Sequence, residues 1–507
     1  MAYDAAWRPA SLSGEGLTLV SNVAYNPAGG TTGFVRNDGV NTFTNTFEYN
    51  SLNQITRQLV KQGVNTTLQD LNYTYSPNQN NGQILSQTDA LSGETVVYEY
   101  NRLNHLIRAE TTSPRWGLQF SYDGFGNRTN QTVTKGTGPN HSVTIQAATN
   151  RILTAGYVDD ANGNLTQMPL MTMTYDIANR MVSSDHSSIG AITYRYNHAN
   201  QRVYMKSGSK ISYFLYGLGG ERLLEMEEQC NGNCWNYQET QRWIYFAGGK
   251  MFQKTGTVLK AVTPNRLSSE AKHYPYGETD GTPPSDTKDY FATYRRDGTN
   301  LDYAWNRYYS PTMGRFTTAD PYGGSASPNN PQSWNRYSYT NGNPVNRIDP
   351  DGLLTIIMGG TALQPWGRSD ADWGKPGTPF HRAVSNYFGE EAVVIEWRGQ
   401  PYTWGSAEAA LANYIAAYDF AEGEKLNVVA HSHGGNVVKN YTWKSEARFI
   451  DVLVTLGTPQ WGFPAIKRTG VGTYLNVYSR NVTGFRRLLD LRRIGRSPDF
   501  RVISLGR

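Results

Sequence analysis

The chain has 507 residues, which is enough for two or more hydrophobic cores. With 38% apolar residues and a mean hydropathy of −0.58 it is polar for an ordinary globular enzyme, but its 12% aromatic residues are too many for a disordered chain. The net charge of +5 is small for this length, so we expect no nucleic-acid partner. The sequence has no run of about 18 apolar residues, so we expect no transmembrane helix, and its first residues lack a basic region followed by an apolar core, so we expect no signal peptide.

One motif recurs over about the first 200 residues. A Tyr is followed by Asp or Asn, then by Gly, Ala or Asn, and then by Arg or Gln. Asn, Asp and Gly tolerate left-handed backbone and favour turns, and the alternation in 172–175 and 192–196 is typical of half-buried antiparallel strands. The motif therefore predicts an array of stacked β-hairpins. Clear copies stand at 49–54, 100–105, 122–128, 175–180 and 196–202.

The only two cysteines, Cys230 and Cys234, flank an Asn-Gly-Asn turn. A small disulfide loop is feasible there in an oxidising compartment, and two free thiols are the alternative. A zinc site would need two further ligands nearby, so we expect no metal and no cofactor.

A denser set of motifs follows between residues 301 and 353. It includes LDYAWNRYYSP at 301–311, GRF at 314–316, NRYSY at 335–339 and IDPDGL at 348–353. Together with the hairpin motif, these resemble the YD repeats and the RHS-associated core domain of the RHS family, which includes teneurins and the C subunits of insecticidal toxin complexes. The resemblance implies a partial β-hairpin shell over residues 1–270, a core domain over 271–353, and a C-terminal toxin carried by the shell.

The resemblance also implies a self-cleavage site at the seam Asp349-Pro350-Asp351-Gly352-Leu353. The cut would fall between Leu353 and Leu354, made by an aspartyl-protease-like site. Candidate aspartates are Asp320, Asp349 and Asp351, with two carboxylates sharing a proton and with Arg315 or Arg347 as electrostatic helpers. The alternative is that the Asp-Pro and Asp-Gly pairs only form turns.

Residues 354–507 have a different pattern, in which short apolar strands alternate with helices. This alternation predicts a parallel sheet covered on both faces, so the expected fold class is an antiparallel β-shell followed by a doubly wound α/β domain. Strands are expected at 354–358, 392–397, 426–430, 451–456, 474–478 and 500–507, and helices at about 406–420 and 436–443.

The string Ala430-His431-Ser432-His433-Gly434-Gly435 stands between a predicted strand and a predicted helix. Small residues two positions before and after a Ser are what a nucleophile elbow needs, because strand and helix pass close to the turn. The segment resembles lipase-like α/β-hydrolases, with Ala430 in place of the first Gly. That resemblance implies Ser432 as the nucleophile and the backbone N–H groups of His433 and Thr361 as the oxyanion hole. His431 and His433 would line the pocket mouth rather than bind zinc.

One catalytic element does not follow the hydrolase order of Ser, acid and His. No histidine comes after His433, and Asn481 occupies the expected acid position. A Ser without a base is a poor nucleophile, so we expect a truncated or weakly active hydrolase unless His381 replaces the base.

Two readings of function follow. The first is an RHS-type polymorphic toxin with a serine esterase or lipase cargo that acts on an ester or lipid of a target cell. It implies an immunity protein, a secretion-system component, and a secreted or cell-surface location, reached through another export system or as part of a longer protein. The alternative is a non-catalytic surface or carbohydrate-binding shell with a degenerate hydrolase tail.

Overall fold

The hairpin motifs and the α/β pattern fold into separate units in the computed structural model of the chain. The shell unit comprises Met1–Pro321 and Ser325–Pro350, and the C-terminal unit comprises Tyr322–Gly324 and Asp351–Arg507. The structure describes all residues except 5–7, 199, 218–219, 230–235, 321–333, 350–353, 359–383, 385–391, 396–403, 417–425, 446, 457, 459–465, 468–469, 480–499 and 506–507. Among the described residues, no helix has the length and apolar character to cross a membrane.

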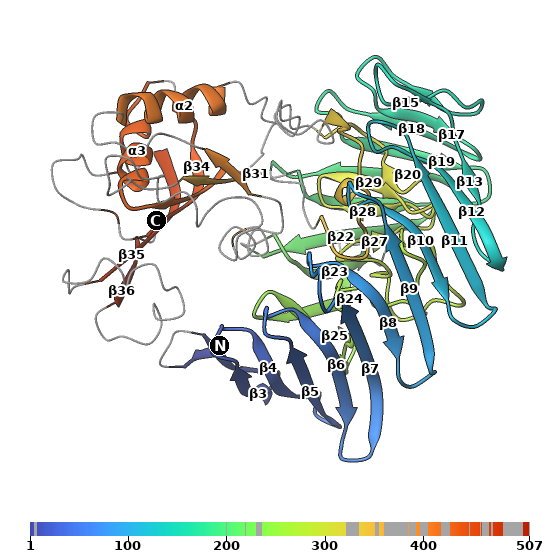
Figure 1. Cartoon of the computed structure of the whole chain (residues 1–507), viewed down its shortest axis with the longest axis horizontal. Helices are drawn as coiled ribbons and strands as arrows, with labels where there is room; N and C mark the ends of the chain where they lie inside the picture. Colours follow the sequence, from blue (N-terminus) through green and yellow to red (C-terminus); the bar gives the residue numbers. More distant parts are fainter. Residues whose placement is uncertain are drawn as a thin grey trace. The chain divides into compact units, whose positions relative to one another are not determined.

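The first sheet of the shell unit has 13 antiparallel strands in chain order (Figure 1). They are β1 (Ala2–Tyr3), β2 (Pro9–Gly14), β3 (Leu17–Tyr25), β4 (Thr31–Asn37), β5 (Thr42–Tyr49), β6 (Ile55–Gln62), β7 (Thr66–Tyr75), β8 (Ile84–Asp89), β9 (Glu94–Tyr100), β10 (Leu106–Thr111), β11 (Trp116–Tyr122), β12 (Arg128–Gly136) and β13 (His141–Ser142).

A short two-stranded sheet and an 11-stranded sheet follow, again antiparallel and in chain order. Their strands are β14 (Ile145–Gln146), β15 (Arg151–Ile152), β16 (Val158–Asp159), β17 (Leu165–Met168), β18 (Met171–Tyr175), β19 (Met181–His186), β20 (Gly190–Tyr196), β21 (Arg202–Ser207), β22 (Lys210–Tyr216), β23 (Arg222–Glu228), β24 (Tyr237–Phe246), β25 (Gly249–Thr255) and β26 (Val258–Ala261). The predicted hairpin array is therefore confirmed.

The repeated motif forms the same turn at each copy. In the copy at Tyr122, the carboxylate of Asp123 accepts hydrogen bonds from the backbone N–H groups of Phe125 and Asn127, at 2.9 and 3.0 Å. The third residue after the Asp or Asn has a positive φ, which is 75° at Gly126 and 60° at Asn179. These are the left-handed positions that Gly and Asn occupy at least cost, which explains the motif.

The Tyr that ends each outgoing strand also joins its repeat to the one before. The hydroxyl of Tyr122 donates to the carbonyl of Leu106 at 2.6 Å, and that of Tyr196 to the carbonyl of Met181 at 2.6 Å. Tyr25, Tyr49, Tyr75, Tyr100, Tyr175 and Tyr216 make the equivalent bond to a backbone carbonyl 10 to 20 residues earlier. This bond was not predicted from the sequence.

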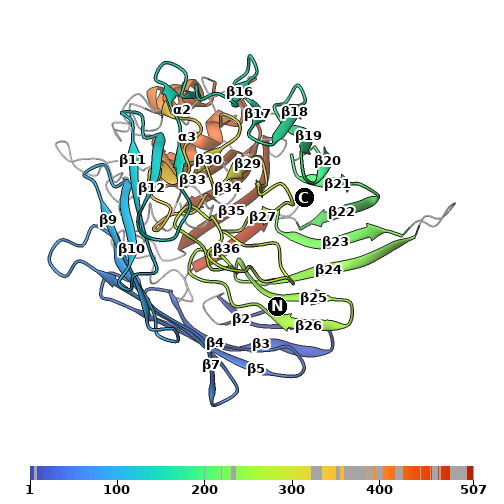
Figure 2. The same cartoon turned by 90° about the vertical axis from the view of Figure 1, so that its right-hand side faces the viewer.

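The segment after β26, called the inner segment below, packs against both large sheets. It contributes β27 (Arg295–Arg296), β28 (Asp302–Ala304), β29 (Arg307–Ser310), β30 (Arg315–Phe316) and the 3-10 turn η3 (Thr340–Gly342). Phe291, Tyr309 and Tyr339 share one core with β7 to β11, and Tyr303, Tyr308 and Met313 share another with β18 to β22. Figure 2 shows its strands β27 and β29 between the blue and the green sheet of the shell unit.

Strands near the start of the first sheet also contact strands at the end of the 11-stranded sheet. Leu19, Phe34 and Phe43 share a core with Phe246 and Phe252. The adjoining turn places the carboxylate of Glu15 3.2 Å from Arg242 and in an ion pair with Lys254. The two large sheets are therefore joined at this end as well as through the inner segment.

The C-terminal unit is built on a six-stranded sheet in the order β32-β31-β33-β34-β35-β36. Its strands are β31 (Leu354–Met358), β32 (Val393–Ile395), β33 (Leu426–His431), β34 (Ile450–Leu456), β35 (Val471–Ser479) and β36 (Phe500–Leu505), and its helices α2 (Trp404–Ala416) and α3 (His433–Tyr441). The predicted parallel pairing holds for all strands except β36, which is antiparallel to β35. Helix α3 begins at His433, earlier than the predicted start near Asn436, because the turn at Ser432 leads directly into it.

Candidate functional site

Two of the three candidate seam aspartates share one arginine in the shell unit. Nη2 of Arg307, on β29, lies 3.2 Å from Oδ2 of Asp349 and 3.7 Å from Oδ2 of Asp320. Arg307 is buried, and its guanidinium stacks on the ring of Phe316 at 3.6 Å. The positive charge of Arg307 offsets the repulsion between the two carboxylates, so both can lie close to it.

The backbone around the pair is fixed by further hydrogen bonds. The hydroxyl of Tyr294 donates to the carbonyl of Asp349. Burial, and next the charge of Asp349, raise the pKa of Tyr294 well above its ordinary value, so the hydroxyl keeps its proton and remains a donor. The backbone N–H of Asp320 donates to the carbonyl of Arg336 at 2.7 Å. The peptide that leads into the seam is thus held at its carbonyl as well as at its side chain.

Arg307, which was not among the expected helpers, is the arginine seen to pair with both carboxylates. Arg315 instead donates to the carbonyl of Asn150 at 2.7 Å and stacks on Tyr337 at 4.4 Å. The backbone N–H of Arg347 donates to Asn343, at 3.3 Å. The signal that could have identified Arg307 is a single charge in a strand, Arg307-Tyr308-Tyr309-Ser310, whose four residues are all buried.

The third candidate and the cleavage junction cannot be placed. Asp351 and Leu353 lie outside the described residues, and Leu354 is the first residue of β31. Thr361, His381 and Asn481 also lie outside the described part, as do Cys230 and Cys234.

In the C-terminal unit, Ser432 occupies a strained turn between β33 and α3. Its φ of 51° and ψ of −129° lie in a region that residues with a side chain seldom adopt. β33 is buried along its whole length between β31 and β34, and the N–H of Ser432 donates to the carbonyl of Leu456 at 2.8 Å. This strand-turn-helix conformation is what a nucleophile elbow requires.

The residue after the turn that needs to be small is also accounted for. A Cβ on Gly435 would collide with the side chain of Thr458, which follows β34. The glycine therefore allows the first turn of α3 to pass close to the end of the neighbouring strand, which adds to the small residues expected at positions 430 and 434.

Two histidines flank Ser432. Burial lowers the pKa of His431 to about 4 and lowers that of His433 below its ordinary value, so both are neutral near pH 7. Nδ1 of His433 lies 3.4 Å from the side-chain amide nitrogen of Asn436. Within the described part of the chain, no group of three or more His, Cys, Asp or Glu side chains is placed to hold a metal ion.

Comparison with known proteins places the fold among toxin shells. No family model matches the chain. The tRNA3(Ser)-specific nuclease WapA of Bacillus spizizenii is 29% identical over 278 residues, which cover 50% of this chain and 12% of the relative. Toxin subunit YenC1 of Yersinia entomophaga is 25% identical over 371 residues, covering 56% of this chain and 37% of the relative. The chain thus spans a minor part of the length of the curated relatives it matches.

Two solved structures have the same fold over most of the chain. A chain of the Photorhabdus luminescens Tc holotoxin pore aligns with a TM-score of 0.55 and 20% identity, over 69% of this chain and 20% of that one. TcdB2-TccC3 without its hypervariable C-terminal region aligns with a TM-score of 0.50 and 17% identity, again over 69% and 20%. The WapA relative is named for a tRNA nuclease activity, which conflicts with the prediction that the chain has no nucleic-acid partner. The antiparallel sheets of this chain therefore have the RHS-type β-shell fold of the toxin-complex proteins.

Proposed function

We propose that the chain is an RHS-type toxin carrier that cuts itself after Leu353 and releases a serine esterase or lipase as cargo. The observation that carries the proposal is the combination, in one chain, of a toxin-type β-shell and a separate α/β unit with a strained Ser432. A shell solved without its hypervariable C-terminal region supports the idea that shell and cargo are separable parts.

The seam reaction follows from the carboxylate pair. One of Asp320 and Asp349 would act as the general base that activates water, and the other as the acid that protonates the leaving nitrogen. Arg307 would keep the two carboxylates close, and the Tyr294 hydroxyl would hold the peptide at Asp349 in place.

The seam is tested by variants of the full chain. Asp320→Asn and Asp349→Asn should give one uncut polypeptide, whereas Asp38→Asn, in an exposed turn far along the chain from the seam, should be cut like the wild type. Equal cutting of all four proteins would exclude the aspartate mechanism.

The cargo reaction follows from the elbow. The hydroxyl of Ser432 would attack the ester carbonyl, with the N–H of His433 and that of Thr361 as oxyanion donors. The candidate for the general base is His381, the one histidine of the C-terminal unit besides His431 and His433. A dead or weak hydrolase is the outcome expected if no base reaches Ser432.

The cargo is tested by hydrolysis of short p-nitrophenyl esters. Ser432→Ala should abolish turnover, and His381→Ala should lower it if that residue is the base. Equal rates of wild type and Ser432→Ala would exclude a serine hydrolase and favour the non-catalytic alternative.

A tRNA nuclease cargo is the competing function, because three of the curated relatives, from Bacillus spizizenii and two strains of Bacillus subtilis, are named for that activity. The elbow at Ser432 favours ester hydrolysis, since an activated Ser serves acyl transfer. Incubation with tRNA separates the two. The proposal also includes an ester or lipid of a target cell as substrate, an immunity protein and a secretion component as partners, and an extracellular or surface location.

A further inference from the structure

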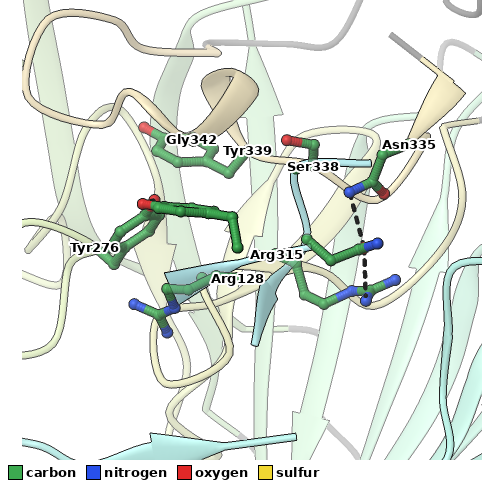
Figure 3. A pocket seen from close by; sticks show the side chains of 11 residues that line it. Arg128, Tyr276, Arg315, Asn335, Ser338, Tyr339 and Gly342 are labelled. Atoms are coloured by element: carbon green, nitrogen blue, oxygen red, sulfur yellow. Dashed lines mark hydrogen bonds between the residues drawn. The ribbon is translucent and has the colours of Figure 1, made fainter. Parts of the chain in front are cut away.

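A small cavity in the shell unit is lined by two arginines that no function above employs. It lies between the turns of β11 to β12 and the inner segment, and Figure 3 shows Arg128 and Tyr276 on one side of it and Arg315, Asn335 and Ser338 on the other. The free space between these side chains is about that of one water molecule or a monatomic ion.

Arg315 brings an uncompensated positive charge to this cavity. The residue is 8% exposed, and its polar contacts are neutral, namely the carbonyl of Asn150 at 2.7 Å and the side-chain oxygen of Asn127 at 3.4 Å. Among the described residues no carboxylate forms an ion pair with it, and Asp159 and Asp123 act on it only from a greater distance. Burial accordingly lowers the pKa of Arg315 to about 10, which shows that its surroundings oppose the charge.

Arg128 brings a second guanidinium to the cavity, with one long ion pair. Its nearest carboxylate is that of Glu278, at the long distance of 3.9 Å, and burial raises the pKa of Glu278. The guanidinium stacks on Tyr276 at 4.2 Å, and its Nε–H has no hydrogen-bond partner although the atom is buried. A buried donor on a cation without a partner is costly.

The remaining polar lining is neutral. The hydroxyl of Ser338 makes no side-chain hydrogen bond to another described residue, and the side-chain amide of Asn335 donates to Asn127 at 2.8 Å. The cavity thus combines N–H and O–H donors, positive charge and a volume too small for a phosphorylated molecule.

From this lining we infer that the cavity is a binding site for a small inorganic anion of the size of chloride, held by Arg315 and Ser338 with Arg128 close by. Such an anion neutralises the buried charge where the inner segment meets the first sheet, so it stabilises the closed shell unit. The competing explanation is that Arg315 is only a structural clamp on the carbonyl of Asn150.

The experiment compares the melting temperature of the full chain in sodium chloride and in sodium gluconate at equal ionic strength, because gluconate is too large for the cavity. The expected result is a Tm higher by about 2 °C at saturating chloride, since a ligand that binds only the folded state raises Tm with its concentration. The line width of the 35Cl NMR signal reports binding directly, and wild-type protein should broaden it more than Arg315→Met does.

Three variants make the test specific. Arg315→Met should lose the response to chloride without losing stability in gluconate, because it removes an unpaired buried charge. Ser338→Asp should also lose the response, because its carboxylate takes the place of the anion. Arg151→Met is the matched control, since Arg151 also donates to backbone carbonyls, of Asp160 at 3.1 Å and Ala161 at 2.8 Å, but does not line the cavity. It should keep the response.

Three results would overturn the inference. The first is an equal Tm of the wild type in chloride and gluconate. The second is loss of the chloride response in Arg151→Met as well, which would mark a general salt effect. If Arg315→Met does not fold, Ser338→Asp decides, and an unchanged chloride response in that variant is the third.

Discussion

Breaking the ion pair between Arg202 and Asp297 should destabilise the shell unit more than most single substitutions. Arg202 begins β21 and is fully buried, and its Nη2 lies 3.1 Å from Oδ1 of Asp297, which belongs to the inner segment. The guanidinium also donates to the hydroxyl of Tyr308 at 2.7 Å and faces the ring of Tyr303 at 4.3 Å. This cluster therefore joins the second sheet to the inner segment.

The size of the destabilisation depends on which charged side chains keep an ion-pair partner after the substitution. In Asp297→Asn, Arg295 still pairs with Glu225 at 3.0 Å, whereas Arg202 has no other carboxylate among the described ion pairs. Leaving one charge buried without its partner costs about 3–5 kcal/mol, a large share of the 5–15 kcal/mol that stabilise a typical domain. With a urea dependence of about 3 kcal/mol per M, the unfolding midpoint should fall by roughly 1 M or more.

The assay is urea unfolding of the full chain, followed by tryptophan fluorescence. Arg202→Met combined with Asp297→Leu should recover most of the loss, because replacing both partners of a buried pair by apolar side chains is often neutral. A midpoint that moves by less than about 0.3 M in Asp297→Asn would refute the reasoning, as would a double variant no better than the single one.

Three further predictions concern other parts of the chain. Burial lowers the pKa of His273 to about 4, below its unfolded value near 6.5. The folded protein should therefore lose up to about 3 kcal/mol of stability as pH falls from about 6.5 towards 4. In urea titrations at several pH values, His273→Gln should flatten this dependence. Tyr196→Phe leaves the carbonyl of Met181 without its donor and should cost about 1 kcal/mol, measured by the urea midpoint against wild type. Gly435→Ala forces its Cβ into Thr458 and should cost about 1–3 kcal/mol and abolish any ester hydrolysis, and a fully stable, active variant would contradict the close passage described at Ser432.

The fold was predictable where local chemistry decides it. The left-handed turns at Gly126 and Asn179 require Gly or Asn, and the alternating strands between them can bury only one face. The strands of the C-terminal unit and the turn at Ser432 were likewise readable from apolar runs and small residues.

What the sequence could not predict depends on contacts between distant residues. The Tyr196 hydroxyl reaches a carbonyl in the preceding repeat, and Arg307 meets Asp349 across 42 positions of sequence. A single charge in a buried strand marks both Arg307 and Arg315, so this signal finds the two candidates but does not say which one meets the carboxylates. The tertiary fold gives one the carboxylates and the other the cavity.

The most direct test of the central claim is the intact mass of the purified full chain together with the N-terminal sequence of its fragments. A self-cut carrier predicts two polypeptides, one ending at Leu353 and one beginning at Leu354, with the second able to hydrolyse esters through Ser432. A single mass for the uncut 507 residues, or a cut at another bond, would contradict the account.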